Sequence, residues 1–101
     1  MIETDYSDLP GADLVETGLA DAASQRETVE SLLVQIGSPR LAQANINVTV
    51  NCDDADRRLY RLLESSFGNE AHSRYNGLIR RLVSFERAVE QRISRAARLS
   101  H

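Results

Sequence analysis

Residues 70–99 read EAHSRYNGLIRRLVSFERAVEQRISRAARL and form the most regular stretch of the sequence. Apolar side chains recur there every three or four residues, the spacing that gathers them on one face of an α-helix. The stretch therefore predicts a long amphipathic helix from residue 70 to residue 99, or from Gly77 if Asn76-Gly77 forms a turn. Its apolar positions are Tyr75, Leu78, Ile79, Leu82, Val83, Phe85, Val89, Ile93, Ala96 and Ala97.

The opposite face of this predicted helix is rich in arginine. At about 100° per residue, the side away from the apolar positions receives Arg74, Arg80, Arg81, Arg87, Arg92, Arg95 and Arg98. One interpretation is a solvated surface, or a seam of salt bridges with an acidic first helix. The other is a positive surface that attracts an acidic protein or nucleic acid. For the second interpretation, the candidate partner-binding residues are Arg80, Arg87, Arg95 and Arg98.

One carboxylate, Glu86, falls near the middle of the apolar positions. A buried carboxylate is unfavourable unless a positive group is paired with it. We expect Glu86 to lie beyond the core. If it is buried, an arginine from another helix or subunit must meet it, and Arg26 on the inward side of the first predicted helix is a candidate.

A second helix is predicted at residues 54–67. Asp53 or Asp54 can cap its first turn, and Gly68-Asn69 ends it. Its buried stripe is expected to contain Leu59, Leu62, Leu63 and Phe67.

A further helix is predicted at residues 10–36. Pro10 suits a first helical turn, and Gly37-Ser38-Pro39 supplies the residues that stop a helix. Gly18 is expected to weaken its early turns. The fold class is therefore mainly α: a small bundle of three helices at about 10–36, 54–67 and 70–99. They would form a single domain at residues 10–101, preceded by a flexible acidic N-terminus at residues 1–9.

Between the first two helices, residues 46–52 alternate strictly between apolar and polar side chains, INVTVNC. This alternation predicts a short β-strand with one buried face. A lone strand cannot satisfy its backbone within one molecule, so it would pair with a second copy or with a partner. The alternative is an extended connector or an edge strand.

The order of segments from residue 46 to residue 85 carries a resemblance. Residues 48–54 (VTVNCDD), a helix closing at Gly68, the pair Ser73-Arg74 and residues 78–83 (LIRRLV) together resemble the ribbon-helix-helix family of DNA-binding proteins. In that family, strands from two subunits pair and enter the major groove. The resemblance implies a homodimer in which Asn47, Thr49 and Asn51 contact base edges, for which their side chains are suited. Ser73 and Arg74 would then be further DNA-contacting candidates.

Charge and composition limit the class of protein. Residues 1–37 carry eight acids and one arginine (−7), whereas residues 38–101 carry seven acids and eleven arginines (+4). Residues 1–8 are acidic and lack the basic region and apolar run of a secretory signal, so export is not expected. No apolar run of about 18 residues occurs in the sequence, so a membrane span is not expected either. The single Cys52 cannot form an internal disulfide, and we expect a cytoplasmic protein. The complete use of arginine over lysine suggests a GC-rich bacterial or phage genome.

No catalytic, metal or cofactor site is predicted. Cys52 with His72 is better explained by a small core residue than by a thiol–imidazole pair, and the acids at residues 53–56 by a helix start than by a metal. We therefore expect a helical interaction protein without enzymatic activity, such as an adaptor, chaperone, inhibitor or regulator, that associates with a protein partner or with itself. The alternative is a dimeric DNA-binding repressor or antitoxin of the ribbon-helix-helix kind.

Overall fold

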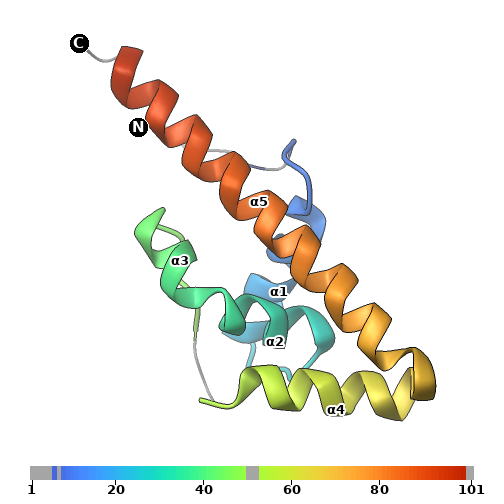
Figure 1. Cartoon of the computed structure of the whole chain (residues 1–101). Coiled ribbons are helices and arrows are strands. Elements are labelled where there is room, and N and C mark those ends of the chain that lie inside the picture. Colours follow the sequence, from blue (N-terminus) through green and yellow to red (C-terminus); the bar gives the residue numbers. More distant parts are fainter. Residues whose placement is uncertain (1–5, 7, 50–52, 100–101) are drawn as a thin grey trace.

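The mainly helical class is confirmed. A computed structural model of the chain describes residues 6, 8–49 and 53–99. The long C-terminal helix crosses the whole molecule, and the shorter helices pack along one side of it (Figure 1). The elements of the described residues are α1 (Ala12–Ala23), α2 (Val29–Ile36), α3 (Ser38–Gln43), α4 (Ala55–Phe67), the 3₁₀ helix η1 (Gly68–Glu70) and α5 (Ala71–Leu99).

The single helix predicted at residues 10–36 is wrong, because the chain turns back on itself in the middle of that range. α1 ends at Ala23, Gln25 takes a left-handed backbone conformation with φ 61°, and α2 begins at Val29. Thr28 caps α2: its Oγ1 accepts from the Ser31 amide at 3.1 Å, and Ser31 Oγ accepts from the Thr28 amide at 2.9 Å. The turn lets the apolar faces of α1 and α2 bury each other, which one straight helix could not do.

Gly18 is the contact point of this hairpin. It is buried where α1 crosses α2, and a β-carbon at this position would lie 2.6 Å from Val34 Cγ1 and closer still to the backbone oxygen of Glu30. The missing side chain therefore allows the two helices to approach closely. The expected weakening of the helix at Gly18 is offset by this packing.

The core lies between the α1–α2 hairpin, α4 and α5. α2 packs against both α1 and α4, and α5 closes the far side. Its buried side chains include Val15, Leu32, Leu33, Val34, Leu41, Leu59, Leu63, Leu82, Phe85 and Val89.

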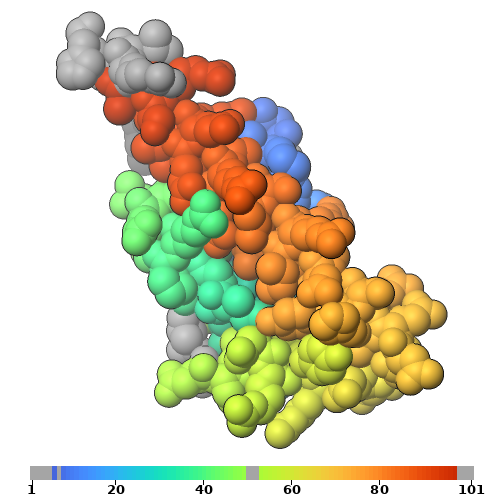
Figure 2. All heavy atoms as spheres, viewed as in Figure 1, coloured from blue at the N-terminus to red at the C-terminus, as the bar shows by residue number. Residues whose placement is uncertain are grey.

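The end of α5 stands clear of this core. The molecule measures 51 × 26 × 20 Å, and α5 runs along its length in Figure 2. Ile93, one of the predicted apolar positions, is 39% exposed there.

Within the described part of the chain, no helix has both the length and the apolar character to cross a bilayer.

The connector after α3 keeps the predicted alternation without forming a strand. Ile46 and Val48 pack against the core, whereas Asn47 and Thr49 are exposed. No β-strand is present among residues 46–49, and no second strand occurs among the described residues to pair with them. Residues 50–52, and with them Asn51 and Cys52, lie outside the described residues. Pairing of this segment across a homodimer stays a prediction.

Candidate functional site

The exposed face of α5 carries one continuous row of polar and small side chains, which we call the outer stripe. It extends over about 33 Å of helix and contains no carboxylate and no large apolar side chain. Gly77 and Ala88 are half-buried in it and its other members are exposed. The outer stripe consists of Ser73, Asn76, Gly77, Arg80, Ser84, Arg87, Ala88, Gln91, Ser94 and Arg95.

Two arginines beside the outer stripe are held by acids from the start of the chain. Arg81 Nη2 donates to Asp13 Oδ1 at 3.0 Å, and Arg92 makes two hydrogen bonds to the Asp8 carboxylate at 2.8 and 3.0 Å. The hydrogen bond from Arg92 holds the pKa of Asp8 below its ordinary value. The predicted salt bridge with the first helix therefore exists at Arg81, whereas the partner of Arg92 precedes that helix. In the N-terminal lead, Tyr6 also packs edge-on against Phe85, with ring centroids 6.2 Å apart.

Three of the predicted partner-binding arginines lie together on the outer stripe. Arg80, Arg87 and Arg95 are exposed, and none forms an ion pair with a carboxylate of the described residues. They are seven and eight positions apart, which places them about 10 and 12 Å apart along the helix axis. Arg98 belongs to the last turn of α5, and its side chain lies outside the described part of the structure.

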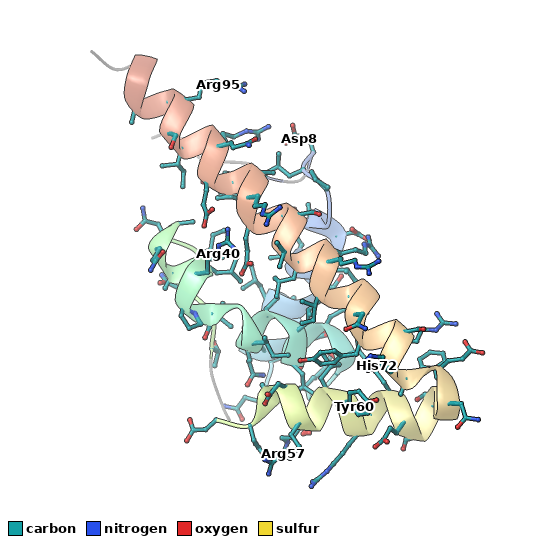
Figure 3. All side chains as sticks on the ribbon, viewed as in Figure 1. Asp8, Arg40, Arg57, Tyr60, His72 and Arg95 are labelled. Atoms are coloured by element: carbon teal, nitrogen blue, oxygen red, sulfur yellow. The ribbon has the colours of Figure 1, made fainter. Side chains whose placement is uncertain are left out.

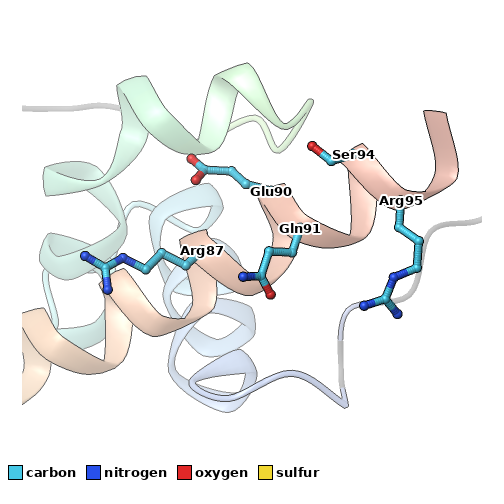
Figure 4. A pocket seen from close by; sticks show the side chains of 5 residues that line it. All are labelled: Arg87, Glu90, Gln91, Ser94 and Arg95. Atoms are coloured by element: carbon cyan, nitrogen blue, oxygen red, sulfur yellow. The ribbon is translucent and has the colours of Figure 1, made fainter. Parts of the chain in front are cut away.

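A shallow groove of about 480 Å³ lies between Arg87 and Arg95. Gln91 and Ser94 line its middle, and Figure 4 shows Arg87, Gln91 and Arg95 along it. Glu90 also lines the groove, but its carboxylate accepts two hydrogen bonds from Arg40 of α3. The two arginines, the amide and the hydroxyl of this lining can attract an anionic group, by charge and by hydrogen bonding.

On the inner face of α5, Glu86 is buried, and the expectation that it lies beyond the core is wrong. Its side chain is 5% exposed, and Oε1 lies 3.4 Å from Nη1 of Arg40. Arg40 donates to Glu90 as well, at 2.7 and 2.8 Å, so that one arginine joins α3 to two acids of α5. Figure 3 labels Arg40 on α3. The candidate partner Arg26 is instead 3.9 Å from Asp21, because the turn after α1 keeps it within the hairpin.

The two acids that Arg40 contacts, Glu86 and Glu90, have pKa values shifted in opposite directions. Burial raises the pKa of Glu86, although Arg40 partly opposes this. Hydrogen bonds from Arg40 lower the pKa of the more exposed Glu90. Arg40 therefore stabilises the charge of Glu90 well and that of Glu86 only partly.

The four predicted DNA-contacting residues that the structure describes are not brought together in the single chain. Asn47 and Thr49 precede α4, whereas Ser73 and Arg74 follow it (Figure 1). The 13-residue α4 separates the two groups, by about 18 Å of helix. Arg74 also has partners of its own, since it lies 3.6 Å from Glu70 and its guanidinium stacks 4.3 Å from the centre of the Phe67 ring.

Sequence reasoning missed a second pair of exposed arginines, Arg57 and Arg61. They lie one turn apart on α4 and form no ion pair within the described residues, whereas their neighbour Arg58 is held by Glu27 at 2.7 Å. Their spacing on the polar side of an amphipathic helix was the available signal. They provide an internal control, because they are exposed like the stripe arginines but belong to a different helix.

The two residues weighed as a thiol–imidazole pair cannot be compared in the structure. His72 lies 3.2 Å from the Asn76 amide and beside the Tyr60 ring, and Cys52 lies outside the described residues. No group of three metal-ligating side chains occurs in the part of the chain that can be described.

Comparisons with known proteins do not identify a relative. A scan against protein-family models, a search of curated proteins and a search of solved structures each gave no significant match. The function therefore has to be inferred from the residues of this chain.

Proposed function

We propose that this protein is a non-enzymatic interaction module that binds an acidic surface of a partner protein through the outer stripe of α5. One observation carries the proposal. Arg80, Arg87 and Arg95 are exposed without an ion pair to any described carboxylate, while the neighbouring Arg81 and Arg92 are held by the chain's own acids. The fold thus uses the flanking arginines internally and leaves those of the outer stripe available.

The expected contribution of these arginines is selectivity and speed of association more than affinity. An exposed ion pair contributes about 0.2–1 kcal/mol, so three such pairs alone cannot hold a stable complex. Complementary charge does accelerate encounter and disfavours basic partners. A tight complex would need further contacts beside the stripe.

The test is a pull-down from the native host with nuclease present, at near-physiological salt. The full chain is compared with Arg80→Glu/Arg87→Glu/Arg95→Glu, and with the control Arg57→Glu/Arg61→Glu. We expect a protein partner that is captured by the wild type and the control but not by the stripe variant, with circular dichroism showing that all three chains are folded. Capture that is indifferent to the stripe would contradict the proposal.

A second candidate is the homodimeric DNA-binding ribbon. It is favoured by one observation, the exposure of Asn47 and Thr49 while Ile46 and Val48 face the core. Such a ribbon would present the exposed pair to base edges. In that case, a host DNA fragment selected by the wild-type protein should no longer bind Asn47→Ala/Thr49→Ala/Asn51→Ala, while the dimer survives in analytical ultracentrifugation. If the wild-type protein is a monomer and binds no DNA, the ribbon hypothesis is contradicted.

A further inference from the structure

The partner segment that fits the outer stripe can be narrowed to one structural class. We infer that it is an acidic α-helix lying alongside α5, an inference that rests on the proposed function. The stripe arginines are separated by seven and eight residues. An adjacent helix running nearly parallel or antiparallel returns to the same face after two turns, or about seven residues. Carboxylates at that spacing would meet Arg80, Arg87 and Arg95 in succession.

The small residues of the outer stripe allow such a helix to come close. Gly77, Ser84 and Ala88 lie on the same side of α5 as the arginines, and a β-carbon at Gly77 would meet no atom within 4 Å. Glycine in the middle of a helix is unfavourable, yet Gly77 relieves no clash within the chain. At Gly18, by contrast, the glycine does relieve a clash, because α2 crosses α1 in contact with it. Gly77 also lies inside a helix, but no described atom is close to it, so a second helix would have room to approach there.

The groove between Arg87 and Arg95 marks where one partner carboxylate would lie. Its lining supplies two guanidinium groups, the Gln91 amide and the Ser94 hydroxyl. A planar carboxylate can accept two hydrogen bonds from one arginine. Glu90 also lines the groove, and the charge of Arg87 contributes to lowering the pKa of Glu90, but the hydrogen bonds of this carboxylate go to Arg40 and leave those of Arg87 available.

Duplex nucleic acid fits this surface less well than a helix does. Asp8 and Asp13 lie beside the stripe with side chains 67% and 75% exposed, so a broad phosphate surface would meet them as well as the arginines. A duplex also carries one charge per ~1.7 Å, or about 13 charges over the ~22 Å from Arg80 to Arg95. A helix about 10–12 Å across can contact the stripe alone and supply one carboxylate for each arginine.

The experiment uses two synthetic probes and the full chain. Both probes are alanine-rich helical peptides of the same composition; one has glutamates at positions i, i+7 and i+15, and the other has the same glutamates distributed around the helix. Binding is measured at low salt from amide shifts of the ¹⁵N-labelled protein. We expect the matched peptide to bind at least about fivefold more tightly than the mis-spaced one, with the shifts confined to the outer stripe.

Two variants test the geometry. Arg87→Gln should weaken the matched peptide about two- to fivefold, the loss of one exposed pair, while Arg57→Gln leaves it unchanged. Gly77→Leu should weaken it further by blocking close approach, although thermal melts should show an undiminished fold.

The outcomes separate this inference from the proposed function. Equal binding of the two peptides, or tighter stripe-dependent binding of a 16-base-pair duplex, would overturn the acidic helix. If neither peptide binds but a host protein is still captured through the stripe arginines, the proposed function survives and the helical partner does not. If neither peptide binds and no host protein is captured through the stripe arginines, both the acidic helix and the proposed function are contradicted.

Discussion

The crossing of α1 and α2 and the outer face of α5 both contain a glycine inside a helix, but only the first has a packing reason for it. A β-carbon at Gly18 would overlap the backbone of α2, whereas one at Gly77 would stand in open space. Glycine lowers helix stability in both places. The α1–α2 crossing is thus packed by the chain's own residues, whereas no described residue packs against Gly77.

The same contrast holds for charge in two consecutive residues of α5. Glu86 points inward, is buried and is met by Arg40, while Arg87 points outward and has no ion-pair partner among the described residues. A buried charge must be paired for the fold to be stable, but an exposed charge need not be. The packed side should therefore control stability, and the outer stripe should control binding.

The largest expected effect is on the packed side, at Phe85. Its ring is 2% exposed and meets Tyr6 edge-on. Phe85→Ala would leave a cavity and lower the free energy of unfolding by about 3–5 kcal/mol, measured by urea denaturation. The matched change on the outer face, Arg87→Ala, should alter it by less than about 0.5 kcal/mol. Similar losses for both variants would abolish the distinction between the two faces.

Gly18→Ala should give the next largest loss. The added methyl group has no room beside Val34 and the Glu30 carbonyl, so α1 and α2 must move apart. Overpacking of this kind lowers the free energy of unfolding by about 1–3 kcal/mol. This loss is larger than the stabilisation expected from the higher helix propensity of alanine. Thermal unfolding followed by circular dichroism measures it. An unchanged midpoint would mean that the hairpin is loosely packed.

Gly77→Ala should have the opposite sign and a smaller size. No atom of the chain obstructs the new methyl group, so helix propensity alone should raise the free energy of unfolding by about 0.5–1 kcal/mol. The same thermal unfolding experiment applies. Destabilisation by this substitution would show that the isolated chain itself packs closely at Gly77.

The sequence predicted the two C-terminal helices closely because their signals are local. α4 occupies Ala55–Phe67 and α5 occupies Ala71–Leu99, within one residue of the expected ranges. The hairpin was missed because the apolar residues of α1 and α2 also fit one continuous helical phase. The available signal was the polar run SQRET at residues 24–28, in which Thr28 caps the second helix.

In the candidate site, too, local features could be predicted from the sequence and contacts between distant residues could not. The exposed row with Arg80, Arg87 and Arg95 follows from the period of one helix and could be predicted. The partner of Glu86 could not, since Arg40 is 46 residues away and its position depends on the missed turn and on α3. Contacts between distant segments require the packing of the whole chain.

Replacing Glu86 by glutamine should change the free energy of unfolding near neutral pH but not at acidic pH. Burial raises the pKa of this carboxyl above its ordinary value of 4.5, so the native state binds the proton more tightly than the unfolded chain does. As the pH rises through this range, the unfolded state loses the proton first and the free energy of unfolding falls. Glu86→Gln removes that titration while keeping the shape of the side chain.

The variant should thus match the wild type below about pH 4 and exceed it in stability near neutral pH. Urea denaturation of both proteins between pH 3.5 and 8 measures the difference. Asp8, Glu27 and Glu90 have lowered pKa values, and their contributions are lost as the pH falls, but both proteins contain them. If the free energy of unfolding of the wild type instead rose above that of the variant with increasing pH, the attraction of Arg40 would outweigh the cost of burying the Glu86 charge.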